Sequence, residues 1–90
     1  MHNPDDERSF EGGLRDIERE VRGTQAPIAG WGTDQTNRAV EEAKSATIAS
    51  RIVGMSRTRP FIAEELLQMN RDRLVGKDLD RVEKIVQGSL

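Results

Sequence analysis

The chain contains no cysteine, which excludes disulfides and thiolate metal sites. Its single histidine is His2, beside the N-terminus, so imidazole ligands and catalytic bases are almost absent as well. We therefore expect neither a metal nor a cofactor. The lack of cysteine fits a cytoplasmic protein or a component of a soluble macromolecular assembly.

Large apolar side chains are scarce. Leu, Ile, Val and Phe together make up 20 of 90 residues, and only three residues are aromatic: Phe10, Trp31 and Phe61. A short chain with so little core material folds alone only marginally. No apolar run approaches the roughly 20 residues of a membrane-spanning helix, and no signal-peptide core follows Met1. We predict a soluble protein that completes its core against a partner or a second copy of itself.

The alternating pattern of β-strands is also absent, and this predicts an all-α fold. Apolar residues at helical spacing indicate three to four helices, arranged as a helical hairpin plus a tethered N-terminal amphipathic helix. The expected helices are 5–22, 34–55, 60–75 and 79–87. The expected division of the chain is an N-terminal helix (1–22), a Gly-rich linker (23–33) and a helical hairpin or bundle (34–90).

The N-terminal helix has one apolar stripe. Asn3 and Pro4 are a typical helix start, as N-cap and first helical residue. The stripe follows a 4-3-4 spacing, which predicts a docking face that enters a groove on a partner. Its members are Phe10, Leu14, Ile17 and Val21.

The segment from Gly23 to Gly32 has the composition of a linker. Ile28 and Trp31 are unusual there because both are large and apolar. Either they fill a gap in the core of this chain, or they contact a partner.

The longest helix is expected to be capped by Thr33 or Asp34 and to end between Val53 and Arg57, ahead of Pro60. Its first half carries a stripe of small residues, which permits close approach of another helix. The stripe residues are Ala39, Ala43 and Ala46. The second half carries larger residues, including Ile48 and Ile52.

After Pro60 a third helix is expected, with Gly76 as its C-terminal stop. Asp78 is expected to cap a last short helix that ends at Gly88.

Catalytic motifs are missing. Adjacent acids such as Glu41 and Glu42 point about 100° apart on a helix, so they do not converge as an acid–base pair. No phosphate-binding glycine loop and no EF-hand loop occurs. The sequence therefore predicts a protein that is not an enzyme and has no small-molecule substrate.

The run from Ile48 to Leu67 resembles the helix-turn-helix family of DNA-binding proteins: an Ile-Ala pair precedes Gly54, and a Ser-Arg-Thr stretch leads into the next helix. The resemblance implies contacts with phosphates or base edges. The residues concerned are Ser56, Arg57, Thr58 and Arg59. The same run also fits a helical hairpin broken by Pro60, with exposed arginines at its turn.

Two functions follow as hypotheses. The first is a non-enzymatic helical protein that acts through helix-mediated protein–protein association, as a homo-oligomer or a subunit or adaptor of a larger assembly. The alternative is a small helix-turn-helix regulator that binds nucleic acid through residues 48–67.

Overall fold

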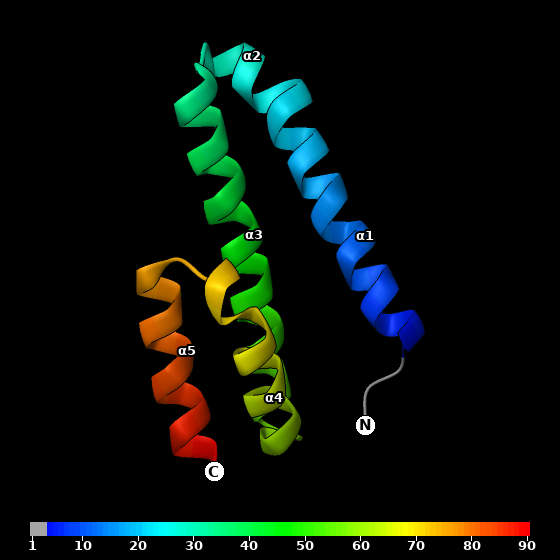
Figure 1. Cartoon of the computed structure of the whole chain (residues 1–90), viewed down its shortest axis with the longest axis vertical. Helices are drawn as coiled ribbons and strands as arrows, with labels where there is room; N and C mark the ends of the chain where they lie inside the picture. The colour runs from blue at the N-terminus through cyan, green and yellow to red at the C-terminus, as the bar shows by residue number, and fades with distance from the viewer. Residues whose placement is uncertain (1–3) are drawn as a thin grey trace. The chain divides into compact units, whose positions relative to one another are not determined.

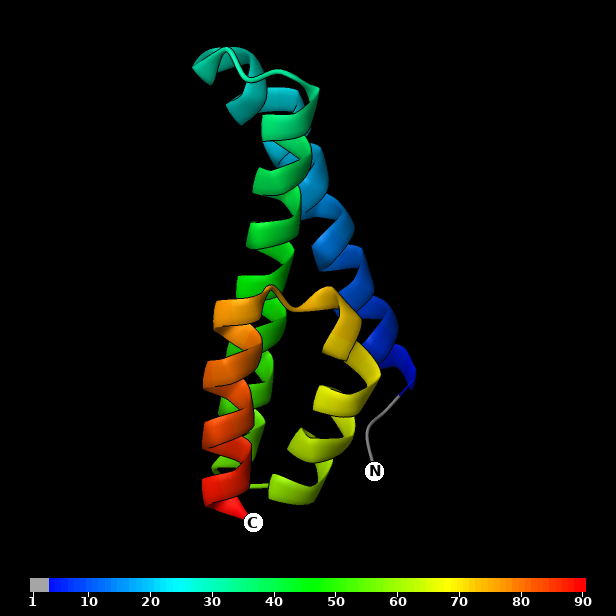
Figure 2. The same cartoon turned by 60° about the vertical axis from the view of Figure 1, so that its left-hand side comes forward.

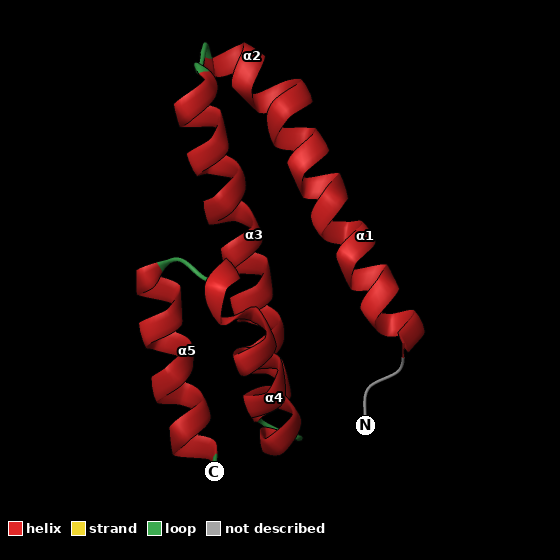
Figure 3. Ribbon diagram, in the orientation of Figure 1, coloured by secondary structure: helices red, strands yellow, loops and turns green. Residues whose placement is uncertain are grey.

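The computed structural model describes residues 4–90, and nearly all of them are helical (Figure 3). Within this range there is no strand, which confirms the all-α prediction. His2 and the expected N-cap Asn3 lie outside the described residues. The helical elements in chain order are α1 (Pro4–Glu20), η1 (Val21–Gln25), α2 (Ala26–Ala29), α3 (Thr33–Ser56), α4 (Pro60–Asn70), η2 (Arg71–Arg73) and α5 (Gly76–Ser89).

The chain forms two compact units, which divide within α3 between Lys44 and Ser45. The predicted linker is therefore not the place where the units separate. The first unit contains α1, η1, α2 and the first half of α3. The second unit contains the rest of α3 with α4 and α5.

In the first unit, α1 lies beside the first half of α3 and runs in the opposite direction (Figure 1). Few apolar side chains of the described residues are buried here: Leu14, Val21, Ala26 and Val40. Lys44 of α3 donates a 2.6 Å hydrogen bond to Glu18 of α1, so these two residues lie opposite each other.

The predicted linker is mostly helical, which corrects that expectation. Residues 21–25 form one π-helical turn, in which the Ala26 N–H donates to the Val21 carbonyl, and α2 continues to Ala29. Pro27 has no N–H, and in an α-helix its ring would clash with the carbonyl four residues earlier. A wider π turn at this point avoids that conflict.

The π turn also preserves the buried stripe. In a regular α-helix, Val21 and Ala26 would lie about 140° apart, on different faces. The extra residue of the π turn brings them to equivalent positions on successive turns, and both are buried. The irregular connection is reduced to Gly30–Gly32, where Gly30 has the left-handed φ of 71° that ends α2.

Gly32, rather than Thr33 or Asp34, caps α3. The Gly32 carbonyl accepts the N–H of Thr36 at 2.9 Å. The Gln35 side chain returns to accept the Gly32 N–H at 3.2 Å, as the third residue of a capping box does. Glycine has no side-chain oxygen to accept a first-turn N–H, so only the Gln35 half of a capping box is present.

In the second unit, α4 runs back beside α3, and α5 reverses direction again (Figure 2). As predicted, α3 ends within 53–57 and α4 begins at Pro60. Most of the buried apolar residues of the described chain lie in this unit. They are Ile48, Ala49, Ile52, Ala63, Leu66, Leu67, Leu74, Val82 and Val86.

A buried polar group joins α3 to the start of α5. The Ser45 hydroxyl donates to the Asp78 carboxylate at 2.7 Å and accepts the Val75 N–H at 2.9 Å. Ser45 is fully buried and Asp78 nearly so. The predicted helix ends differ here: Gly76 begins α5 instead of stopping the preceding helix, Asp78 lies inside its first turn, and α5 passes Gly88 to end at Ser89.

Candidate docking groove

An apolar groove lies between the two helical arms of the first unit. Ile17 and Val21 line one side, Ala39 and Ala43 line the other, and its volume is about 330 Å³. Asp16, Glu20 and Gln25 complete its lining. We call this feature the docking groove.

The groove forms because the facing side chains differ in size. On α3 the residues toward the groove are alanines, and their short side chains leave space in front of the α3 backbone. Ile17 is only half-buried, and Ala39 and Ala43 are also partly exposed. The α1 arm therefore covers this part of the small-residue stripe incompletely.

A second hollow of about 260 Å³ adjoins the docking groove and shares Ala39 with it. Trp31, Gln35, Arg38 and Glu42 complete its lining. Arg38 and Glu42 are one helical turn apart and exposed, and within residues 4–90 neither takes part in an ion pair. This flank of α3 thus carries one free positive and one free negative charge.

Charged groups fix the two arms against each other. Glu18 accepts hydrogen bonds from Lys44 at 2.6 Å and from Arg22 at 2.8 Å. The hydrogen bonds from Lys44 and Arg22 lower the pKa of the Glu18 carboxyl from 4.5 to about 2. Glu18 is ionised at neutral pH, and its ion pair with Lys44 joins α1 to α3 beside the groove.

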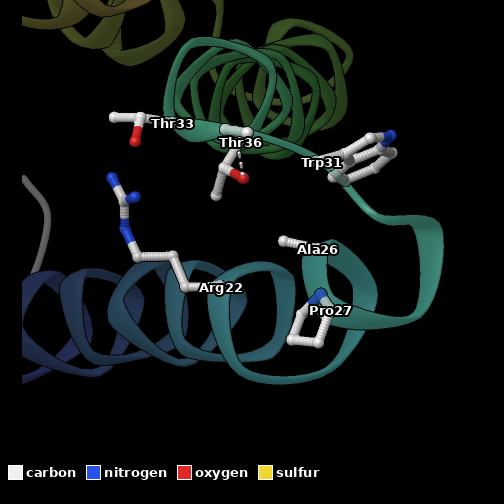
Figure 4. Close-up of a pocket in the computed structure, with 7 residues that line it drawn as sticks. Arg22, Ala26, Pro27, Trp31, Thr33 and Thr36 are labelled. Atoms are coloured by element: carbon white, nitrogen blue, oxygen red, sulfur yellow. Dashed lines mark hydrogen bonds between the residues drawn. The ribbon is translucent and has the colours of Figure 1, made fainter.

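A third hollow, of about 350 Å³, lies at the α2 end of the same unit (Figure 4). Arg22 extends from its helix toward Thr33, and the Thr36 hydroxyl donates to the Gly32 carbonyl at 2.8 Å. Arg22 is engaged by Glu18. The polar groups of this hollow, Arg22 and Thr36, thus bond to other residues of the chain. We identify no ligand site in this hollow.

The structure brings together four of the nine residues predicted to bind a partner: Ile17, Val21, Ala39 and Ala43 all line the docking groove. Leu14 is 1% exposed and does not line the groove, so it belongs to the core alone, whereas Val21, at 3% exposure, belongs to the core and also borders the groove. The other four do not line the groove: Phe10 is half-buried, Ile28 is 83% exposed, Trp31 lines the adjoining hollow, and Ala46 is exposed and belongs to the second unit.

Sequence reasoning missed the charges that flank the groove. Arg38 and Glu42 stand on either side of the alanine at position 39, four residues apart. That spacing is visible in the sequence and places both on one flank of a helix. Which side of α3 faces the groove depends on how α1 packs against it. This packing cannot be read from the spacing of residues in the sequence.

The four residues of the nucleic-acid hypothesis are not equally accessible. Ser56 is buried, and its hydroxyl donates to the Val53 carbonyl at 2.7 Å. Arg57, Thr58 and Arg59 are exposed in the turn before α4. The N–H groups of Thr58 and Arg59 both donate to the Met55 carbonyl, which fixes the turn.

Within residues 4–90 no three His, Asp or Glu side chains lie close enough to hold a metal ion. None of the described helices combines the length and the hydropathy needed to cross a membrane. Comparison with protein-family models, curated proteins and solved structures finds no match to this chain.

Proposed function

We propose that this protein is a non-enzymatic helical module that acts by associating with another protein surface through the docking groove. One observation carries the proposal: the first unit leaves an apolar groove open to solvent, while its described apolar core is limited to Leu14, Val21, Ala26 and Val40. A helical arm with so small a core gains stability when a partner covers its open face.

The lining of the groove suits a docked helix. Ile17 offers one bulky apolar contact, and the alanines opposite allow the backbone of an incoming helix to approach closely. Polar residues of the lining, such as Gln25 and Glu20, resemble the polar rim that surrounds the apolar centre of many interfaces.

Cross-linking in the host cell tests the proposal. A photoreactive amino acid at Gln25, an exposed residue of the groove lining, should give a covalent adduct with the partner. Ile17→Asp in the same chain should abolish the adduct. This substitution places a carboxylate where the partner must cover the groove, and desolvation of that charge opposes binding.

Two controls accompany the experiment. The same photoreactive residue at Gln87, exposed on α5, should give no adduct. Met69→Asp, at an exposed apolar position on α4, should leave the Gln25 adduct unchanged. Absence of any adduct from position 25, or an adduct that persists in Ile17→Asp, contradicts the proposed function.

A second candidate function rests on the exposed turn with Arg57 and Arg59. These guanidinium groups, which carry no ion pair within residues 4–90, are available to phosphates. We propose DNA binding through this turn as the alternative. A salt-dependent shift of duplex DNA that is lost in the double variant Arg57→Ala/Arg59→Ala supports it. Lack of a shift at low salt rejects it.

A further inference from the structure

We infer that the partner of the docking groove is a second copy of this chain, related by a two-fold axis that places the first half of α3 antiparallel to itself. The inference rests on the proposed function and specifies its partner. It is carried by the arrangement of charges and small residues on α3.

The charges are self-complementary. Arg38 and Glu42 lie on the same flank of α3, beside the groove, and neither has an ion-pair partner within the described residues. When two such helices meet antiparallel about a point level with Val40, Arg38 of each copy comes opposite Glu42 of the other. One two-fold axis therefore creates two ion pairs from groups that are unpaired in the single chain.

The side-chain sizes agree with the same axis. Ala39 lies close to its centre, where the two α3 helices approach most closely and only small residues fit, and Ala43 follows one turn away. Because Glu18 of α1 lies opposite Lys44 of α3, the neighbouring Ile17 lies at about the level of residue 45 along the α3 axis. The same axis brings Ile17 of each copy toward the Gln25 end of the groove in the second copy. The bulky Ile17 thus contacts the open groove of the second copy, and the small Ala39 contacts its counterpart on the second α3 helix.

A different two-fold axis, parallel to the hairpin arms, is disfavoured by charge. It would place α1 against α3 of the second copy at the same height. Because Glu18 is opposite Lys44 in the hairpin, this arrangement brings Glu20 opposite Glu42 of the second copy, and two like charges would meet twice. The antiparallel α3 arrangement avoids this conflict.

The charge pairs allow a test by exchange. Arg38→Glu alone sets two carboxylates against each other at both symmetric contacts, and Glu42→Arg alone sets two guanidinium groups against each other. Each variant should weaken self-association roughly tenfold or more, since two attractive contacts become repulsive. In an equimolar mixture, the Arg38→Glu chain carries carboxylates at positions 38 and 42, and the Glu42→Arg chain carries guanidinium groups at both. A dimer of one chain of each kind therefore has only opposite charges in contact. The mixture should therefore form a heterodimer.

Sedimentation velocity on the purified full chain measures these outcomes, with native mass spectrometry to separate hetero- from homodimers after labelling one variant with heavy nitrogen. The wild-type chain should have twice its 10.1 kDa mass. Arg81→Glu, an exposed charge reversal of the same kind on α5, is the matched control and should remain dimeric. Circular dichroism shows whether each variant keeps its helical content.

A wild-type chain that stays monomeric at about 100 µM, a concentration at which an interface of micromolar affinity is largely occupied, overturns the inference. A mixture of the two charge variants that stays monomeric also overturns it, as does undiminished self-association of either variant alone. The adduct at Gln25 separates the two proposals. An adduct with another protein, together with a monomeric purified chain, removes the second copy as the partner and leaves the proposed function in place. Absence of an adduct removes both.

Discussion

The two compact units of this chain differ in how they are stabilised. The second unit buries apolar residues on three helices, among them Ile52, Leu66 and Val82, each with no exposed surface. The first unit is a pair of arms with few buried apolar residues and an ion-paired Glu18 between them. Both units are almost entirely helical, so the comparison shows that helix formation and core formation are separate outcomes. A unit can be fully helical and still leave its apolar face open.

The largest expected effect lies in the core of the second unit. Leu66→Ala removes a fully buried side chain and should lower the free energy of unfolding by about 2–5 kcal/mol. Val40→Ala in the first unit removes a smaller side chain at 5% exposure and should cost about half as much or less. Chemical denaturation of both variants measures the difference. Equal losses would contradict the contrast between the units.

The next effect comes from the buried polar group. Ser45→Ala leaves the Asp78 carboxylate and the Val75 N–H without their hydrogen bonds to Ser45, and this should cost about 1–3 kcal/mol. Ser50→Ala, further along the same helix and exposed, is the control and should change stability by less than about 0.5 kcal/mol. Thermal unfolding of the two variants side by side distinguishes them. A Ser45→Ala chain as stable as wild type would show that the buried network contributes nothing net.

A smaller effect, of opposite sign, is expected in α1. Gly12 has helical geometry, and a Cβ added there meets only the end of the flexible Arg15 side chain, at 3.6 Å. Gly12→Ala should therefore stabilise α1 by about 0.5–1 kcal/mol, because alanine loses less conformational entropy in a helix. Residue-resolved hydrogen exchange should show slower exchange in α1 and no change in α5. Unaltered exchange in α1 would mean that the stability of this arm does not depend on its helix propensity.

The smallest effect concerns pH. The pKa of Glu18 is lowered to about 2 in the folded chain, so its ion pairs contribute fully above pH 4.5 and are lost as the pH falls toward 2. The side chains of Glu18 and Lys44 are 35% and 28% exposed, and solvent screening limits the contribution to about 1 kcal/mol or less. Glu18→Gln should be slightly less stable than wild type at about pH 6, and the difference should disappear as the pH approaches the lowered pKa of Glu18. A difference that is constant over this range would exclude the ion pairs as its cause.

Much of the fold was predictable from local signals. The spacing of Leu14 and Val21 indicated a helix, and Pro60 marked the break between α3 and α4, because proline restricts the residue before it and starts helices well. The linker prediction was wrong because glycine lowers helix propensity by only about 1 kcal/mol, which does not exclude a helical turn at Gly23. The π turn that accommodates Pro27 depends on hydrogen bonds five residues apart, for which a single-residue propensity contains no signal.

The candidate groove was predictable in part. Four residues on two separate helical patterns were expected to bind a partner, and they do line one groove. Leu14 belongs to the same stripe as Ile17 but is buried, because residues three positions apart are offset by about 60° around a helix and Leu14 therefore lies nearer the centre of the packed face. The position of Arg38 and Glu42 beside the groove was not predictable, because it depends on how α1 packs against α3.

The sequence by itself determined that this chain is helical, where its main breaks fall and that its apolar residues are few. These are local properties, set by backbone propensity, proline geometry and side-chain spacing. The tertiary structure alone decided that Ser45 and Asp78 meet in the second unit and that Ile17 lies across an open groove from Ala39 and Ala43. Such contacts join residues far apart in the chain, and only the packing of one helix against another selects which faces meet.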